Sequence, residues 1–408
     1  MIVVVSADHR QGGGISVVRV SVVEVRFRIE AAEYNTGETK RHPAALFEQG
    51  EPRMTKLVLC CDGTWDSADQ EKDKKTGELC VSNVLKLACR TAKRDADGTL
   101  QIVYYDQGVG TGNILDKIGG GAFGDGLDAN INDAYRFLIA NYEPGDEIYL
   151  FGFSRGAFTA RSIAGMIRRC GILRREFVKS YPDAKALYRK GVDSGSDEAR
   201  AFRKQFAIED DTAIQCIGVW DTVGALGIPV GLFKSINEKE YQFHDTRLSS
   251  AVKFAFHALA VDEHRPPFAP TLWDSVPLAG QTVEQAWFAG AHSDVGGGYP
   301  EHGLSDLVLE WIMASAVRAG LKLDDAAVSA LGTRPDHKQD VHNSLGFFKL
   351  HSIQRTIGTT KTEHFHKSLI EKWRDDKKYR PKPLGPHAAR LDALAGSALA
   401  EEIYPVAT

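Results

Sequence analysis

Three residues in this sequence could together transfer an acyl group, and each stands at the end of a short apolar run. Ser154 lies within GFSRG, which fits the pattern G-x-S-x-G, while Asp221 follows AIQCIGVW and His292 follows AWFAGA. In acyl transfer a serine hydroxyl attacks the carbonyl carbon, a histidine takes and returns the proton, and a carboxylate orients the imidazole. Ser154 is therefore the candidate nucleophile, His292 the candidate base and Asp221 its orienting acid.

The flanks of Ser154 predict the turn that such a nucleophile needs. Residues 147–153 are apolar, follow a Pro-Gly-Asp turn signal and predict a buried strand. After the serine, small or apolar residues recur at helical spacing, which lets a helix lie close to a sheet: Ala157, Ala160, Ala164 and Ile167. A strand, a sharp turn and a helix form a nucleophile elbow. The alternative is an ordinary strand-to-helix turn of an α/β domain.

The oxyanion that forms in acyl transfer needs hydrogen-bond donors beside the serine. The backbone N–H of Arg155, at the start of the predicted helix, is one candidate. A second donor is expected from Gly63 or Thr64, which follow Asp62 and the apolar run 56–61. Loops after such strands are where parallel sheets place their ligands. Asp62 is accordingly kept as a secondary site residue.

Each of these assignments has a competitor. Asp221 could merely cap the turn after its strand, and His292 could be a hydrogen-bonded loop histidine. Asp294 is a second candidate for the acid, but it shares the glycine-rich turn HSDVGGGY with His292, which favours hydrogen bonding to that turn's own backbone. His257 and His366 are alternative bases. The helical apolar pattern around His257 favours a position in the core.

Four apolar runs precede Asp62, Ser154, Asp221 and His292. If these runs are parallel strands, their ends lie on one edge of a sheet, and the chain order Ser, Asp, His is that of an α/β-hydrolase. The sequence therefore predicts an α/β-hydrolase-like fold with a mostly parallel central sheet and flanking helices. Further predicted elements are a strand at 101–105 and helices after Ser82, at 127–142, at 249–259 and from Ser305 to Ala319.

Residues 1–53 differ in character from the rest of the chain. They lack the basic region and cleavage site of a signal peptide, and within them VEVRFRIE alternates like a half-buried strand. Met54 stands directly before the first core strand. The segment is therefore expected to be an extension outside the fold, with translation starting at Met54, or else an added edge hairpin.

The remaining chain divides into two segments. Residues 54–330 are expected to form the catalytic domain, with insertions at 171–210 and 228–285 that shape a lid and an acyl pocket. Residues 331–408 are polar and are expected to be a solvated, irregular segment that packs on or caps this domain.

Composition narrows the classes of function. The chain has 408 residues, 43% of them hydrophobic and 25% charged, as in a soluble globular protein, and its net charge of −4 argues against nucleic-acid binding. No apolar run approaches the roughly 20 residues that span a bilayer. Six cysteines show no C-x-x-C spacing and predict reduced, buried thiols. We expect a cytoplasmic location, with export by a signal-less route left open, and neither a cofactor nor a metal.

Several blocks of the sequence, taken together, resemble those of a large family of uncharacterised α/β-hydrolases that includes the catalytic domain of type VI secretion phospholipase effectors. They span roughly residues 55–320 and are LCCDGTWD, SNV, YYDQGVGTG, GLDANINDAYRFL, GFSRGAFTAR, GVWDTVGALG, YQFHDT, ALAVDEHR and GAHSDVGGGY. The family's triad matches Ser154, Asp221 and His292. The resemblance implies a phospholipid or other lipid acyl ester as substrate and transient contact with a membrane surface. This chain is shorter than the secreted effectors and shows no membrane-docking module after the catalytic domain.

Other classes of function fit the residues less completely. An aspartate-nucleophile phosphatase would need an aspartate two residues before Asp62, where this chain has Cys60. The glycines of 108–126 suggest a phosphate-binding loop, but no G-K-[ST] follows them. A non-catalytic binding or scaffold module remains the alternative to a serine esterase, and reaction with a fluorophosphonate probe distinguishes the two.

Overall fold

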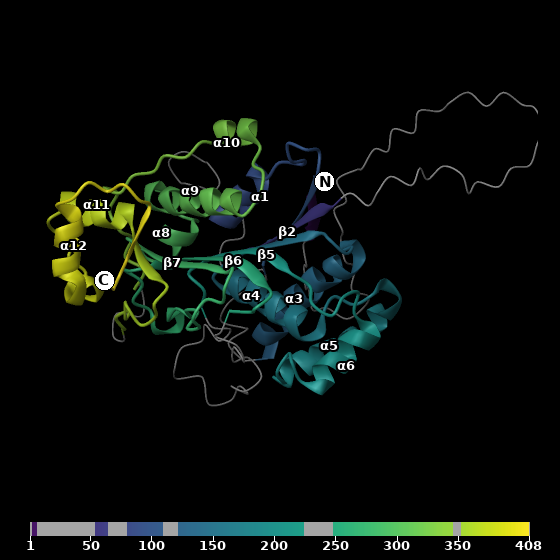
Figure 1. Ribbon diagram of the computed structural model, residues 1–408. Coiled ribbons are helices and arrows are strands. Elements are labelled where there is room, and N and C mark those ends of the chain that lie inside the picture. The colour runs from purple at the N-terminus through teal and green to yellow at the C-terminus, as the bar shows by residue number, and fades with distance from the viewer. Residues whose placement is uncertain are drawn as a thin grey trace, which may run out of the picture.

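A computed structural model describes residues 2–5, 54–63, 80–108, 121–223, 248–345 and 352–407. Within these ranges the strands form one sheet in the order β1-β3-β2-β4-β5-β6-β7-β8-β9. Neighbouring strands run parallel, except that β8 and β9 are antiparallel. Helices cover both faces of the sheet (Figure 1). The predicted α/β-hydrolase-like fold is therefore confirmed.

The strands that carry the predicted site lie in the middle of this sheet. The strands of the whole described sheet are β1 (Ile2–Val5), β2 (Thr55–Cys61), β3 (Leu100–Asp106), β4 (Glu147–Phe153), β5 (Ile214–Trp220), β6 (Val252–Ala260), β7 (Thr282–Phe288), β8 (Glu363–His366) and β9 (Ile403–Pro405). From β2 the chain crosses to β3 on one side and then returns to β4 on the other. Parallel sheets bind ligands where the strand order reverses in this way.

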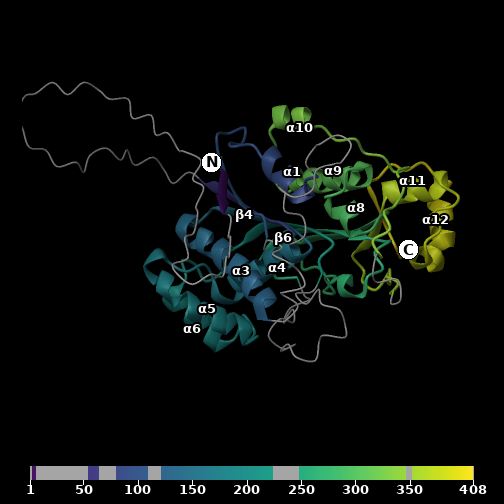
Figure 2. The same cartoon turned by 180° about the vertical axis from the view of Figure 1, so that it is seen from behind.

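The helices lie in layers above and below the sheet. They are α1 (Asn83–Arg90), α3 (Gly121–Asn141), α4 (Arg155–Cys170), α5 (Tyr181–Arg189), α6 (Asp197–Phe206), α8 (His292–Gly296), α9 (Gly303–Arg318), α10 (Asp325–Leu331), α11 (Lys367–Asp375) and α12 (Ala388–Ala395). Helices α3 to α6 cover one face, while α1 and α9 cover the other (Figures 1 and 2).

Alternation along β2 shows how the sequence builds both layers. Leu57, Leu59 and Cys61 pack into the core beneath α3 and α4, whereas Val58 and Cys60 pack into the core beneath α1 and α9. Successive side chains of a strand point to opposite faces, so a strand buried on both faces is apolar throughout. The two adjacent cysteines are therefore buried on opposite faces. The prediction of buried thiols is wrong for two cysteines, since Cys80 is partly exposed and Cys89 is exposed.

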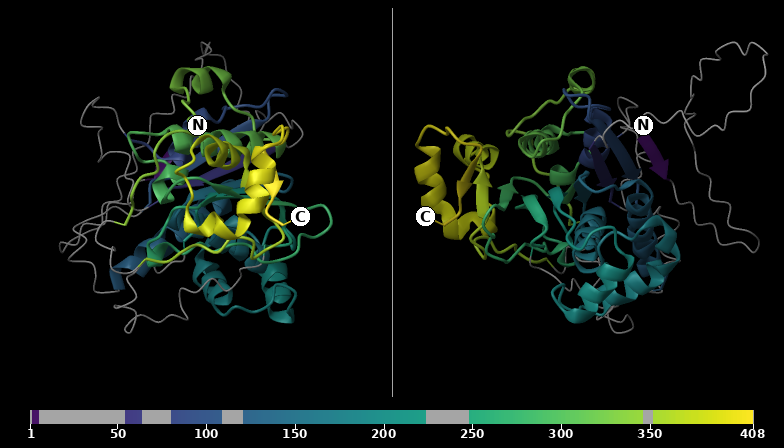
Figure 3. Two further views of the ribbon diagram at one scale, coloured as in Figure 1. Left: turned by 90° about the vertical axis from the view of Figure 1, so that its left-hand side faces the viewer. Right: turned by 45° about the vertical axis from the view of Figure 1, so that its right-hand side comes forward.

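The region from residue 352 onward differs from the predicted irregular segment. Strands β8 and β9 extend the central sheet beyond β7, and α11 and α12 pack on them around a core of their own. Figure 3 shows this region in yellow at the edge of the sheet opposite the N-terminus. Its core includes Phe365, Leu369, Trp373 and Leu391 at helical or strand spacing. The many charged residues between these positions hid that pattern.

Two other predictions of local structure are wrong. The predicted helix at 249–259 is strand β6, whose residues from Ala255 to Ala260 are buried on both faces of the sheet. Apolar runs of this length do not distinguish a buried strand from a helix by periodicity. Since β6 lies between β5 and β7, this part of the segment predicted as the second insertion belongs to the sheet. Helix α9 begins at Gly303, so Ser305 lies inside its first turn.

Other predictions match, are wrong in part or lie outside the described residues. Ser82 caps α1, since its hydroxyl accepts a hydrogen bond from Leu85 N at 3.1 Å. The expectation that residues 1–53 lie outside the fold or form an edge hairpin is wrong for Ile2–Val5, which pairs with β3 as a parallel strand at the edge of the sheet. VEVRFRIE, Thr64 and the glycines at 110–120 lie outside the described residues. Among the described helices, none is long and apolar enough to cross a membrane.

Candidate active site

The turn after β4 holds Ser154 in a backbone conformation that serine rarely adopts. Its φ is 56° and its ψ is −117°, and α4 starts at the next residue. A Cβ on Gly152 would lie 2.3 Å from Gly156 O, and a Cβ on Gly156 would lie 2.0 Å from Cys61 O. Both glycines of G-x-S-x-G are thus required by the close approach of strand, turn and helix. This is the geometry of a nucleophile elbow.

The other two predicted residues meet in a hydrogen bond at the same edge of the sheet. Asp221 follows β5, next to β4, and His292 begins α8 after β7. His292 Nδ1 lies 2.6 Å from Asp221 Oδ2, and both side chains are buried. Because Asp221 holds Nδ1, the opposite ring nitrogen of His292 is the one left for proton transfer.

Aromatic rings fix the plane of the His292 imidazole. The Phe153 ring lies beside it at a centroid distance of 4.5 Å, and the Phe268 ring meets it edge-on at 4.8 Å. Phe153 precedes Ser154 directly, so the imidazole packs against the strand residue that leads into the elbow. Among the described residues, buried His292 Nε2 has no hydrogen-bond partner. A buried nitrogen without a partner is suited to accept a proton.

The charges around this pair fix its protonation state. Burial alone raises the pKa of Asp221, but the Arg355 guanidinium and the His292 imidazole outweigh it and hold that pKa far below its usual range. Burial lowers the pKa of His292, and the hydrogen bond to Asp221 offsets only part of this. At neutral pH the pair is therefore an ionised carboxylate beside a neutral imidazole, which is the form that a general base requires.

Arg355 is a member of the site that the sequence did not reveal. Its guanidinium donates from Nη1 to Asp221 Oδ1 at 2.5 Å and from Nη2 to Asp221 Oδ2 at 2.9 Å, and both side chains are fully buried. It lies in the polar region predicted as an irregular segment. A lone arginine in such a region carries no signal of its own, so only the fold brings it to the site.

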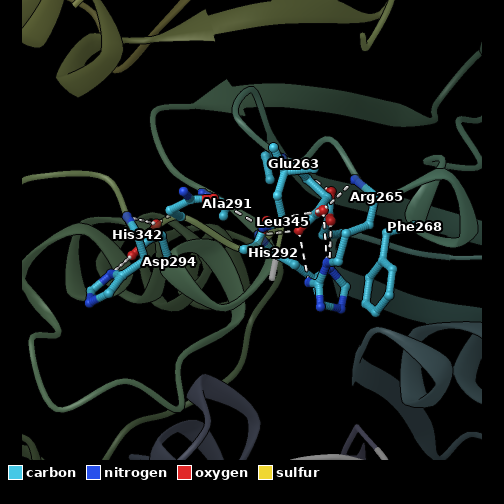
Figure 4. Close-up of polar contacts among 12 residues, drawn as sticks. Glu263, Arg265, Phe268, Ala291, His292, Asp294, His342 and Leu345 are labelled. Carbon is cyan, nitrogen blue, oxygen red and sulfur yellow. Dashed lines mark hydrogen bonds and ion pairs between the residues drawn. The ribbon is translucent and has the colours of Figure 1, made fainter. Parts of the chain in front are cut away.

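Asp294 lies near His292 but makes different contacts. Its carboxylate accepts hydrogen bonds from Ala291 N at 2.9 Å and from His342 N at 3.0 Å, and it meets His342 Nδ1 at 2.6 Å (Figure 4). The first bond closes the turn that starts α8, and the others tie that turn to the segment around residue 342. These contacts are the ones expected of a residue that organises the turn.

Glu263 is a third buried acid beside His292, and sequence reasoning did not single it out. It is fully buried, accepts a hydrogen bond from His292 N at 3.3 Å, and pairs with Arg265 Nη2 at 2.8 Å. Figure 4 shows Arg265 between this carboxylate and the ring of Phe268. Burial raises the pKa of Glu263, but the hydrogen bond and charge of Arg265 outweigh this effect and leave the pKa below its ordinary value. The carboxylate is therefore ionised. Glu263 lies within ALAVDEHR, one of the blocks that resemble the family, and this was the sequence signal that could have identified it.

The loop after β2 is organised by Asp62. Its carboxylate accepts hydrogen bonds from Ser82 Oγ, from Tyr105 OH at 2.7 Å and from Gly63 N at 2.7 Å. Burial raises its pKa to about 6. A Cβ on Gly63 would lie 3.5 Å from Ser154 Cβ, so this loop borders the elbow. The N–H of Gly63 donates to Asp62, so of the two donors expected from the sequence only Thr64, which lies outside the described residues, is left to consider.

The SNV and HSDVGGGY blocks meet behind this loop. Asn83 Nδ2 donates to Val295 O at 3.0 Å, and Ser82 pairs with Gly297 in an isolated bridge. Gly297 has a φ of +89°, and a Cβ there would lie 2.7 Å from Asn83 N. A Cβ on Gly296 would overlap the ring of Phe153. The glycines after His292 are thus needed for close packing beneath the site.

The two alternative bases occupy structural positions. His257 is buried on β6, where its Nε2 accepts from Thr222 N at 3.1 Å, and burial lowers its pKa to about 3. His366 caps α11, since its Nδ1 accepts from Ser368 N at 3.1 Å. In the described part of the chain, no group of three or more histidine, cysteine or acidic side chains is arranged to hold a metal ion.

Comparison with known proteins identifies relatives of this chain. Residues 55–315 match the family model described as T6SS, phospholipase effector Tle1-like, catalytic domain. The uncharacterized protein YEL023C of Saccharomyces cerevisiae is 30% identical over 267 residues, which are 59% of this chain and 35% of that protein. This chain therefore spans only about a third of the length of that relative.

Two solved structures are also similar, both at low sequence identity. One is an uncharacterized protein from Pseudomonas aeruginosa, at 19% identity and a TM-score of 0.39, covering 66% of this chain and 46% of that one. The other is the Tle1 effector bound to the VgrG spike from the type 6 secretion system, at 21% identity and a TM-score of 0.36, covering 60% and 51%. The family model matches residues 55–315, which are more than half of this chain. The chain belongs to the Tle1-like family of type VI secretion phospholipase catalytic domains.

Proposed function

We propose that this protein is a serine hydrolase that cleaves a carboxylic ester, in particular a phospholipid or other lipid acyl ester. The observation that carries the proposal is the 2.6 Å contact between Asp221 and His292 Nδ1 at the sheet edge where Ser154 stands in a strained elbow. Strained backbone at a nucleophile persists only where the surrounding fold enforces it. Here Gly152 and Gly156 permit the close packing that does so.

The proposed reaction uses each of the three side chains once in each half. Ser154 Oγ attacks the ester carbonyl carbon while His292 Nε2 takes the hydroxyl proton, and Asp221 stabilises the imidazolium through Nδ1. Collapse of the tetrahedral intermediate breaks the bond to the leaving alcohol, which receives the proton from His292. Water then attacks the acyl-enzyme by the same route in reverse, releasing the carboxylic acid and Ser154.

The oxyanion of the intermediate is assigned to backbone donors at the elbow. Arg155 is the first residue of α4, and the first N–H groups of a helix lie outside its internal hydrogen-bond pattern. The positive end of the helix also favours negative charge there. Thr64, which follows Gly63 in the sequence, is proposed as the second donor. Each such donor contributes about 3 kcal/mol to the transition state in comparable sites.

A lipid substrate is proposed from the family. The matched family is named for a phospholipase effector, and its catalytic domain is the part that this chain shares. An ester of a long acyl chain would bring the enzyme into transient contact with a membrane surface. The names of the family and of one structural relative refer to type VI secretion. Export of this chain by such a route is part of the proposal.

Labelling by a fluorophosphonate probe tests the mechanism, with mass spectrometry to locate the adduct. We expect the adduct on Ser154 and none in Ser154→Ala. A panel from short p-nitrophenyl esters to phospholipid vesicles, assayed beside this variant, then defines the acyl substrate. Wild-type protein that is folded but neither labels nor hydrolyses any ester would instead favour the non-catalytic binding module. Labelling of Ser154→Ala equal to that of wild type would show that another residue is the nucleophile.

A further inference from the structure

Arg355 connects the catalytic edge of the sheet to the region that follows the family match. It lies 40 residues beyond residue 315, where the match ends. Besides its two hydrogen bonds to Asp221, its Nη2 donates to Phe268 O at 2.8 Å. The ring of Phe268 packs edge-on against His292. One guanidinium therefore fixes two of the groups that hold the imidazole.

We propose that Arg355 is a positioning residue of this hydrolase, which orients Asp221 toward His292 and keeps the imidazole unprotonated at neutral pH. The inference rests on the roles proposed for Asp221 and His292. It also implies that the working unit of this chain extends beyond residues 55–315, because the segment 352–362 completes the site.

The segment that carries Arg355 is held on both sides of it. Ile353 N donates to His264 O at 2.9 Å, in the loop that also contains Phe268. On the other side, the carboxylate of Glu363 accepts from Gly358 N at 2.8 Å and from Thr360 N at 2.6 Å. A guanidinium carried by such a segment meets Asp221 in one orientation, and a fixed fork suits two carboxylate oxygens.

The charge of Arg355 determines the pH at which the Asp221–His292 pair binds a proton. With Arg355 present, the three groups are together neutral while His292 is neutral, and protonation leaves a buried positive charge. Without Arg355, the pair is a buried anion until it binds a proton and becomes neutral. Burial disfavours net charge, so the variant pair must bind its proton at a higher pH. The shift to higher pH is expected whether the proton is on Asp221 or on His292.

Other charges face the pair from the elements packed around it, and they are the same in the variant. Glu263 and Arg265 lie beside His292 and act in opposite directions on its pKa. His257, from β6, interacts electrostatically with Asp221 and with Arg161 of α4. His257 stays neutral because burial lowers its pKa to about 3. A difference between wild type and an Arg355 variant therefore reports Arg355 itself.

The direct experiment is a histidine-ring NMR titration of the full chain, with the His292 signal identified by its loss in His292→Gln. We expect the protonation midpoint to rise by about one pH unit or more in Arg355→Met. Arg355→Lys keeps the charge and should stay close to wild type in midpoint, while its ester turnover falls because an ammonium cannot hold both oxygens of Asp221. Arg203→Met is the matched control, since Arg203 is also buried and pairs with a carboxylate, Asp210, at 2.9 Å.

The outcomes separate this inference from the proposed function. A folded Arg355→Met whose midpoint equals that of wild type and of Arg203→Met would overturn it. If Arg355→Met does not fold, Arg355→Lys decides: unchanged turnover at an unchanged midpoint would reject the positioning role. Recovery of Arg355→Ala turnover by added guanidinium ion, at concentrations that leave wild type unaffected, would support it. Failure of wild type to label at Ser154 would reject the proposed mechanism, whereas the titration would still report the effect of Arg355.

Discussion

Asp221 and Asp294 are both buried carboxylates near His292, and the fold holds them in different ways. Asp221 follows β5, and among the described residues its carboxylate accepts from one backbone donor, Ala260 N at 3.1 Å, and from the side chains of His292 and Arg355. Asp294 belongs to the same short helix as His292 and accepts from two backbone N–H groups and from the His342 ring. Separation along the chain explains the contrast.

A carboxylate on another strand can reach the side of an imidazole that faces away from its own turn. One that lies two residues from the histidine instead satisfies the backbone of the turn they share. The comparison therefore favours a catalytic role for the carboxylate in the region after β5 and a structural role for the carboxylate in the region after β7. Changes at these two regions should separate turnover from stability.

The largest expected effect is the loss of turnover in Asp221→Asn. An asparagine can accept only through one oxygen, and it no longer stabilises the imidazolium or fixes its tautomer. In the best-studied serine protease the equivalent change lowers turnover about 10⁴-fold. Steady-state hydrolysis of a soluble p-nitrophenyl ester, normalised to folded protein, measures the effect. Turnover within tenfold of wild type would remove Asp221 from the mechanism.

The next effect concerns stability in the same region. From sequence alone, Asp221→Asn is expected to fold normally, but the buried Arg355 changes that expectation because it would lose its charge partner. Breaking a buried ion pair by removing one partner commonly costs about 3–5 kcal/mol in the free energy of unfolding. Replacing both partners is tolerated better, so Asp221→Asn combined with Arg355→Met should recover much of the loss. Urea unfolding of both variants measures this, and a double variant less stable than Asp221→Asn would contradict it.

A smaller effect is expected at the turn after β7. Asp294→Asn keeps one acceptor oxygen but loses charge-assisted hydrogen bonds to two backbone groups and to His342. We expect a loss of about 1–3 kcal/mol in the free energy of unfolding, with turnover changed less than tenfold per folded molecule. Melting temperature and ester hydrolysis are measured together. A fully stable but inactive variant would show that Asp294 takes part in the chemistry.

The smallest effect is a pH dependence that distinguishes the two regions. The hydrogen bond to Asp294 raises the pKa of the partly exposed His342 above its ordinary value. The ion pair of protonated His342 with Asp294 therefore stabilises the folded state fully below about pH 6.5, and this contribution is lost as the pH rises through the raised pKa of His342. Wild type should exceed His342→Gln in stability at about pH 6 and by less at about pH 9, with a difference no larger than about 1 kcal/mol. A difference that grows with pH would contradict the assigned pair.

Much of the catalytic edge could be predicted because its residues follow short-range rules. Ser154 sits between glycines that the turn requires, and the strands before Ser154, Asp221 and His292 are apolar runs bounded by turn signals. These features are local, so spacing and residue type reveal them. The contrast between Asp221 and Asp294 followed from chain distance alone.

The parts that sequence reasoning missed depend on long-range packing. From Ala255 to Ala260, strand β6 is buried on both faces by neighbouring strands and helices, and a mostly apolar run of its length also fits a helix. Arg355 reaches Asp221 across 134 residues of chain, and Glu263 reaches His292 across 29. Nothing local to either residue specifies those partners. These contacts depend on the folded chain, in which β8 pairs with β7 and Ile353 N donates to His264 O.

The most direct test of this account is the ester turnover of Asp221→Asn and Asp294→Asn, each expressed per folded molecule and measured beside wild type. The arrangement of hydrogen bonds predicts that Asp221→Asn loses about 10⁴-fold in turnover, while Asp294→Asn keeps more than about a tenth of it. An active Asp221→Asn beside a folded, inactive Asp294→Asn would reverse the roles of the two carboxylates.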